Sequence, residues 1–199
     1  MGDSASVTAV NCSVEGATLN GKLLVTLKRI TGTRVSYPYA VSIDLQFNNL
    51  VAQSASTRTV GNGHLLVSIE GRTANEGSLD LSTSDFSIAG NYGGVAYSQS
   101  LSNYDSSIVT MSSSTSASTS GILTSSAFKS KSIAIKTLVP FVRVNSQTYP
   151  GSGKMLITGA AGSAVRITAT SATTVLIELD ADGNGSYEKS TSKLWTEML

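Results

Sequence analysis

The stretch that decides the fold is Tyr39-Ala40-Val41-Ser42-Ile43-Asp44-Leu45-Gln46-Phe47-Asn48, in which bulky apolar side chains alternate with small or polar ones. A period of two is that of a β-strand with one face buried and the other face in water. Shorter runs along the chain alternate in the same way, and none has helical spacing: Leu65-Val67-Ile69, Leu79-Leu81, Ile133-Ile135, Val165-Ile167 and Val175-Ile177-Leu179. The sequence therefore predicts an all-β protein.

Glycine and asparagine residues separate these runs. They occur together at Asn20-Gly21, Gly61-Asn62-Gly63, Gly90-Asn91, Gly93-Gly94 and Asp182-Gly183-Asn184-Gly185. Both residue types tolerate positive φ, as tight hairpin turns require. We therefore expect about ten short strands, joined as hairpins into an antiparallel sandwich, a barrel or an extended meander.

Three segments resemble one another and suggest an internal repeat. Residues 20–27 match residues 62–69, and residues 152–158 form a looser third copy. An acidic residue between aliphatic neighbours follows each copy, at Asp44, Asp80 and Glu178. The spacing leaves room for one degenerate copy in the Ser/Thr-rich middle of the chain. A duplicated β-meander has this pattern; the alternative is that any glycine turn leading into an aliphatic strand gives such a match.

Two stretches bear on the number of domains. The run 110–121 is rich in Ser and Thr and has apolar residues on both sides, so it predicts either a hairpin loop between two strands or a flexible linker. Residues 145–154 contain Pro150 and two glycines. We expect a single all-β domain over 1–199; a boundary near 145 would divide it into a β-meander, 1–145, and a C-terminal hairpin region, 146–199.

Charge and composition exclude several classes of function. The net charge is +1, and no basic run exceeds Lys28-Arg29, so we expect neither nucleic acid nor an anionic membrane surface as a partner. No apolar stretch is long enough for a membrane span.

The single cysteine, Cys12, excludes an internal disulfide and is expected to be a buried or inert thiol. The single histidine, His64, takes the place of Lys22 in the repeat, which predicts a solvent-facing side chain. We predict no catalytic residues and no enzyme activity.

The most specific group of polar residues lies near the C-terminus. Oxygen ligands at alternate positions with a glycine between them resemble the first half of a calcium-binding EF-hand loop. Its twelfth position carries Thr191 in place of the bidentate Glu, so a calcium affinity near that of extracellular modules is expected. The alternative is a metal-free hairpin turn. The candidate Ca²⁺ ligands are Asp180, Asp182, Asn184, Ser186 through its carbonyl, and Glu188.

Tyrosines form a second candidate site. Tyr92, Tyr97 and Tyr104 are close in sequence, and exposed tyrosines on a sheet can stack on sugar rings. The alternative is that they are half-buried, with the hydroxyl group reaching water. The first interpretation predicts a carbohydrate-binding module.

The first 70 residues or so resemble a family of uncharacterised exported β-rich bacterial proteins, some of them lipoproteins. The resemblance rests on Asn11-Cys12, Leu19-Asn20-Gly21, Leu45-Gln46-Phe47-Asn48-Asn49-Leu50 and Gly61-Asn62-Gly63. The resemblance implies no activity. The hydroxyl-rich, charge-poor composition also suits an exported protein, so we expect a secreted, periplasmic or cell-surface location, with a signal or anchor removed before Asp3.

Together these observations predict a non-enzymatic, secreted or surface-attached structural or binding domain, stabilised by calcium. Its partner would be a surface glycan or another protein. The alternatives are a carbohydrate-binding module that uses the three tyrosines, and an open β-barrel that binds an apolar ligand.

Overall fold

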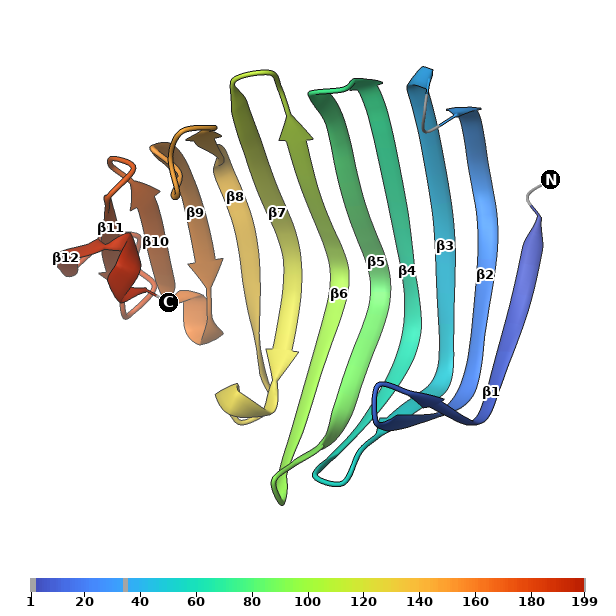
Figure 1. Ribbon diagram of the computed structural model, residues 1–199. Coiled ribbons are helices and arrows are strands. Elements are labelled where there is room, and N and C mark those ends of the chain that lie inside the picture. The colour runs from blue at the N-terminus through green and yellow to red at the C-terminus, as the bar shows by residue number, and fades with distance from the viewer. Residues whose placement is uncertain (1–2, 34–35, 199) are drawn as a thin grey trace.

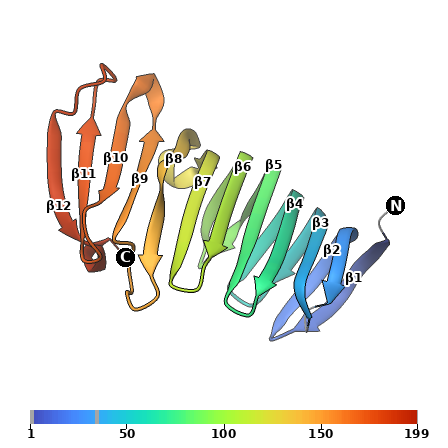
Figure 2. The same cartoon turned by 90° about the horizontal axis from the view of Figure 1, so that it is seen from above.

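The computed structural model describes residues 3–33 and 36–198, which form one antiparallel sheet of twelve strands (Figure 1). Every strand pairs with the next strand in the sequence, and the strands follow one another in a single layer (Figure 2). The strands are β1 Ser4–Val14, β2 Ala17–Thr33, β3 Ser36–Gln53, β4 Thr57–Thr73, β5 Glu76–Tyr92, β6 Val95–Thr110, β7 Ser114–Ser125, β8 Lys131–Val144, β9 Ser152–Thr158, β10 Ala164–Ala169, β11 Thr174–Asp180 and β12 Lys189–Leu194. The all-β prediction and the extended meander are confirmed, and the sheet is not closed into a barrel.

Three short 3₁₀ helices lie outside the sheet: η1 Ser126–Phe128, η2 Ala160–Gly162 and η3 Trp195–Glu197. The Ser/Thr-rich run forms the end of β6 and most of β7, with a turn of residues 111–113 between them. The run therefore lies in a hairpin and is not a linker, but most of it is strand and only residues 111–113 form the connection. Strands β8 and β9 are hydrogen-bonded to each other, so the sheet continues past residue 145.

The prediction of short strands was wrong for the first half of the chain. Strands β2 to β6 have 16 to 18 residues each. Asn20-Gly21, residues 61–63 and Gly90-Asn91 lie inside β2, β4 and β5 and not in turns. Gly93-Gly94 does form the turn between β5 and β6, and residues 182–185 lie in the connection between β11 and β12.

Glycines inside the long strands and β7 face β-bulges in neighbouring strands. Asn11, Asn49 and Asn103 have positive φ and lie in β1, β3 and β6, where the pairing register shifts. A Cβ atom on Gly21 would overlap the carbonyl oxygen of Asn49, so only glycine fits there. Gly121 faces Asn103 in the same way, with a Cβ at 3.0 Å from its carbonyl oxygen.

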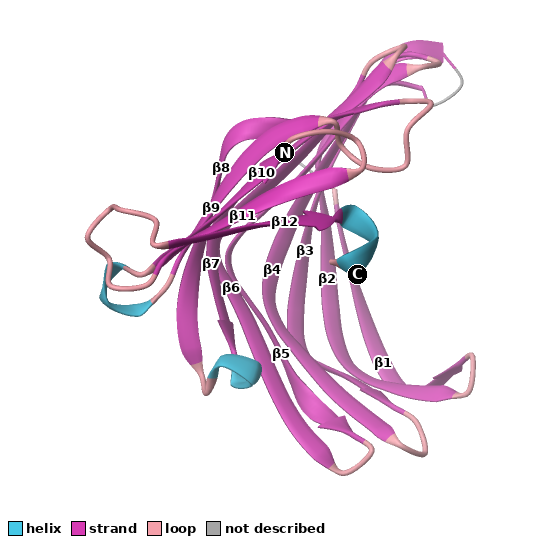
Figure 3. Ribbon diagram, turned by 90° about the vertical axis from the view of Figure 1, so that its left-hand side faces the viewer, coloured by secondary structure: helices cyan, strands magenta, loops and turns pink. Residues whose placement is uncertain are grey.

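Asparagine side chains hold two of these bulges in place. The Asn11 backbone N–H donates to Asn20 Oδ1 at 2.8 Å, and the Asn49 backbone N–H donates to Asn62 Oδ1, also at 2.8 Å. The repeated Asn-Gly pair is therefore a repeated bulge partner and not a hairpin turn. Bulges bend a strand and increase its twist, and the sheet is visibly bent along its strands (Figure 3).

The two faces of the sheet differ in chemistry. Val41, Ile43 and Leu45 of β3 lie on one side, which we call the aliphatic face. Asp44 lies on the other side, the polar face. The register places the following side chains on the aliphatic face with those of β3: Leu23, Val25 and Leu27 of β2, Leu65, Val67 and Ile69 of β4, and Leu79 and Leu81 of β5.

Ion pairs hold charged groups on the polar face of the same strands. Lys28 Nζ lies 3.7 Å from Asp44 Oδ2, and Arg29 Nη1 lies 3.5 Å from Glu70 Oε1. These side chains are substantially exposed, so each pair contributes little to stability. Their effect is to keep charge away from the aliphatic face.

Candidate functional site

The loop after β11 brings the predicted calcium ligands together. Asp180 is buried, whereas Asp182 and Glu188 are exposed. One carboxylate oxygen from each of these three residues lies within 4.8 Å of the other two. The sequence predicted this grouping because all three residues belong to one short loop.

Backbone N–H groups of the loop fill the acceptor positions of these carboxylates. Asp180 Oδ1 accepts from Gly183 N at 2.8 Å, and Asp180 Oδ2 accepts from Gly185 N at 2.9 Å. Glu188 Oε2 accepts from Ala181 N at 2.9 Å. Thr191 is part of β12 and pairs with Ile177, so the twelfth EF-hand position does not belong to the loop.

Asn184 and Ser186 complete the predicted ligand set. Asn184 Nδ2 donates to Asp182 Oδ2 at 3.0 Å, and Asn184 Oδ1 accepts from Ser186 N at 2.7 Å. The loop is thus a chain of side-chain-to-backbone turns. Its oxygen donors are of the type that Ca²⁺ prefers, so calcium remains a prediction for this loop.

The loop is attached to the polar face through Tyr187. The Arg166 guanidinium lies 4.1 Å from the centroid of the Tyr187 ring. Arg166 also makes two hydrogen bonds of 2.6 Å to the Glu178 carboxylate. The hydrogen bond from Arg166 lowers the pKa of Glu178 below 4.5, and the same bond raises the pKa of Arg166.

The three tyrosines do not share one position on the sheet. Tyr92 lies at the end of β5 and is 69% exposed. The Tyr97 hydroxyl is hydrogen-bonded to Thr59 Oγ1 at 2.5 Å. Tyr104 is half-buried and pairs with Thr83, which lies seven residues from the Gly90 that pairs with Tyr97. At about 3.3 Å per residue, Tyr104 is more than 20 Å from Tyr97. Tyr92 and Tyr97 are diagonal neighbours on β5 and β6, and sugar stacking remains a prediction.

His64 lies on the polar face in contact with Ser84. Its Nε2 is 3.2 Å from Ser84 Oγ, and Ser84 Oγ donates to Asp85 Oδ1 at 2.8 Å. In a Ser-His-Asp triad the carboxylate binds Nδ1 of the histidine, but here Asp85 binds the serine. The His64 side chain is 44% exposed, in line with the solvent-facing position expected for it. Cys12, in contrast, is exposed and not buried as expected.

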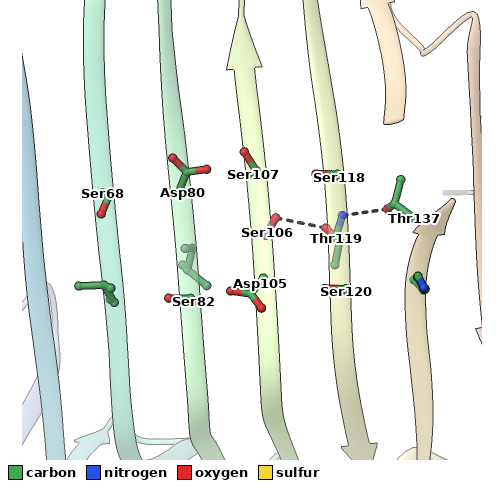
Figure 4. A pocket seen from close by; sticks show the side chains of 13 residues that line it. Ser68, Asp80, Ser82, Asp105, Ser106, Ser107, Ser118, Thr119, Ser120 and Thr137 are labelled. Atoms are coloured by element: carbon green, nitrogen blue, oxygen red, sulfur yellow. Dashed lines mark hydrogen bonds between the residues drawn. The ribbon is translucent and has the colours of Figure 1, made fainter. Parts of the chain in front are cut away.

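A hollow of about 410 Å³ lies over the middle of the polar face (Figure 4). Its lining comes from strands β4 to β8 and consists mainly of serine and threonine side chains, which are small. Asp80, Asp105 and Lys136 are its charged residues. The register places Asp80 and Asp105 diagonally on neighbouring strands, because Asp80 pairs with Ser107 and Asp105 pairs with Ser82.

The aliphatic face is the largest feature that the sequence did not predict as a site. Ile69 is 39% exposed and Leu79 is 41% exposed, although both lie in the middle of the sheet order. Among the apolar residues that the structure describes, those that are buried are Ala9, Ala40, Ala164, Ala169 and Val175. The alternation had indicated a buried face, but from β1 to β5 no second layer of the described chain covers it.

Comparisons with protein-family models, with characterised proteins and with solved structures found no match. Within residues 3–33 and 36–198, no helix is long and apolar enough to cross a membrane. The resemblance to exported bacterial proteins therefore remains a prediction.

Proposed function

We propose that this protein is a non-enzymatic binding or structural domain, secreted or surface-attached, whose aliphatic face is its binding surface. The observation that carries the proposal is the exposure of aliphatic side chains over neighbouring long strands. Exposed apolar patches larger than a few hundred Å² mark interaction sites in soluble proteins. A single open sheet takes the place of the open β-barrel in the apolar-ligand alternative.

The total surface supports this proposal. The chain has a mass of 20.5 kDa and an accessible surface of 11861 Å². A compact folded chain of that mass exposes about 8,800 Å². The surplus of about 3,000 Å² is what a single-layer sheet leaves uncovered.

An environment-sensitive apolar dye, 1-anilinonaphthalene-8-sulfonate, tests this proposal. We expect the dye to fluoresce with the folded protein at submicromolar concentration, and Leu79→Lys to lower that fluorescence several-fold because it puts a charge on the aliphatic face. The matched control is Ser78→Lys, on the polar face of the same strand, which should leave the fluorescence unchanged. Equal dye binding by both variants would contradict the proposal.

Calcium stabilisation is a second part of the proposal, supported by the three carboxylates that approach within 4.8 Å. At a dissociation constant of about 10⁻⁴–10⁻³ M, 10 mM calcium should raise the unfolding midpoint by about 3–8 °C relative to excess EDTA. Glu188→Gln keeps an acceptor for Ala181 N but removes the charge, and should abolish the rise. Asp85→Asn, outside the loop, should retain it. No rise in the parent protein would exclude a calcium site.

A further inference from the structure

We infer that a second copy of this chain covers the aliphatic face, so that two sheets pack face to face in a twofold dimer. This inference rests on the proposed function, because it names the partner of the same surface. It would turn two single-layer sheets into one two-layer domain, the arrangement in which a sheet with one apolar face is stable.

The chemistry of the face fits another copy of itself. The paired alternate positions of β2 to β5 on this face all have aliphatic or aromatic side chains, and none has a charge. These positions are 23, 25 and 27 in β2; 41, 43, 45 and 47 in β3; 65, 67 and 69 in β4; and 79 and 81 in β5. Phe47 and Phe86 add an edge-to-face aromatic pair, with centroids 5.4 Å apart. A twofold interface must be complementary to itself, and an uncharged aliphatic surface meets that condition because it has no like charges to bring together.

Charged residues lie at the margin of the same face. The register places Lys189 of β12 opposite Leu179 and Lys193 opposite Val175, at the C-terminal edge of the sheet. Both lysines are exposed. An apolar centre with a charged, solvated rim is the ordinary composition of a protein–protein interface.

The area also fits. Stable obligate homodimers bury about 2,000–5,000 Å² in total, or about 1,000–2,500 Å² on each copy. The surplus surface of about 3,000 Å² per chain, which belongs to both faces of the sheet, is of the same order as that requirement. Stacked sheets lie about 10 Å apart with interdigitating side chains, so a face-to-face dimer can bury most of the aliphatic face at once.

The first experiment measures mass and dye binding together, by light scattering after size-exclusion chromatography and by dye fluorescence over a range of protein concentrations. We expect a mass of two chains, with fluorescence per chain that falls as the dimer forms. Leu79→Lys should give a single-chain mass, and Ser78→Lys should keep the mass of two chains. A single-chain mass at all concentrations with constant dye binding would overturn the dimer but leave the apolar binding surface standing. A single-chain mass without dye binding would overturn both.

A second measurement does not depend on a destabilising charge. In a Cys12→Ser background, Leu79→Cys places one thiol on the aliphatic face and Ser78→Cys places one on the polar face. We expect maleimide to label Cys at 79 at least ten-fold more slowly than Cys at 78 at concentrations where the dimer forms, and at a similar rate after dilution. Equally fast labelling of both thiols in the concentrated protein would overturn the dimer.

Discussion

The long strands β2 to β5 and the short strands β9 to β11 both have alternating apolar side chains, but these side chains differ in how deeply they are buried. In the long-strand region, Ile69 and Leu79 keep about two fifths of their surface exposed. In the short-strand region, Val175 has no exposed surface and Ala169 has 7%. The same kind of apolar face is therefore open in the long-strand region and closed around Val175 in the short-strand region, where Ile177 and Leu179 remain half-buried.

The difference comes from the C-terminal turn. Trp195 follows β12, and its backbone N–H donates to the Thr173 carbonyl at 3.1 Å. Its ring stacks on Tyr149 with centroids 6.1 Å apart and meets the edge of Phe141 at 6.3 Å. These three aromatic rings cover one end of the short-strand region. Alternation thus predicts which side chains share a face, whereas burial depends on a segment that comes back over that face.

The largest expected effect is in the long-strand region, for Gly63→Ala. Gly63 has φ +99°, and a Cβ atom would overlap the Asp85 carbonyl oxygen of the neighbouring strand. We expect a loss of about 3–4 kcal/mol of unfolding free energy, from backbone strain and overpacking together, measured by urea denaturation. Gly94→Ala is the control: φ is +87°, but nothing lies within 4 Å. Equal losses would mean that the close approach of the strands is not the reason for glycine at 63.

Trp195→Ala should open the short-strand region. We expect a loss of about 2–3 kcal/mol, somewhat less than for a fully buried tryptophan, together with faster amide hydrogen exchange in β10 and β11. Tyr92→Ala, which removes an exposed ring, is the control and should change stability by less than about 0.5 kcal/mol. If exchange in β10 and β11 did not change, the aromatic cover would not be what distinguishes the two regions.

Removal of an asparagine side chain that holds a bulge in place should lower the unfolding free energy by a smaller amount. Asn62→Ala removes the acceptor for the Asn49 backbone N–H, and a loss of about 1 kcal/mol is expected from one hydrogen bond. Asn20→Ala removes the equivalent acceptor for Asn11 near the sheet edge. We expect the same loss or less there, because β1 has a neighbour on one side only. A larger loss for Asn20→Ala would contradict this ranking.

The smallest effect concerns acid stability in the short-strand region. The pKa of Glu178 is lowered in the folded protein, so its pairing with Arg166 stabilises the fold above pH 4.5 and the contribution is lost as the pH falls through the lowered pKa. Glu178→Gln should therefore lower the unfolding midpoint slightly at pH 7, and the difference from the parent should shrink below pH 4.5. Glu15→Gln, in the exposed turn between β1 and β2, should show neither effect.

Local sequence predicted the strands well and their ends poorly. The ten-residue alternation around Ile43 lies in β3 as expected. Asn20-Gly21 was assigned to a turn because a turn and a bulge both need positive φ, and the pair alone does not distinguish them. A bulge differs from a turn in that a neighbouring strand forms hydrogen bonds to the residues before and after the Asn-Gly dipeptide. Whether such a strand is present is a non-local property.

The same limit applies to the candidate sites. The carboxylates of Asp180, Asp182 and Glu188 were predicted to be close and are close, because nine consecutive residues contain all three. The aliphatic face is assembled from four strands, with residues drawn from Leu23 to Leu81 of the sequence. Its composition was visible in the sequence, but its exposure depends on the absence of a covering layer over that part of the described chain.

The row of bulges has a consequence for how such a sheet can grow. Asn11 with Gly21 and Asn49 with Gly63 place a bulged strand beside a glycine-bearing strand, twice in succession. This order changes between β5 and β6, because the register shift against β4 lies in β5 and the register shift against β7 lies in β6. The pairing of β5 with β6 stays in register through this point, so a sheet of this kind tolerates bulges in adjacent strands and can be widened by one strand or by a hairpin without a break in its ladder.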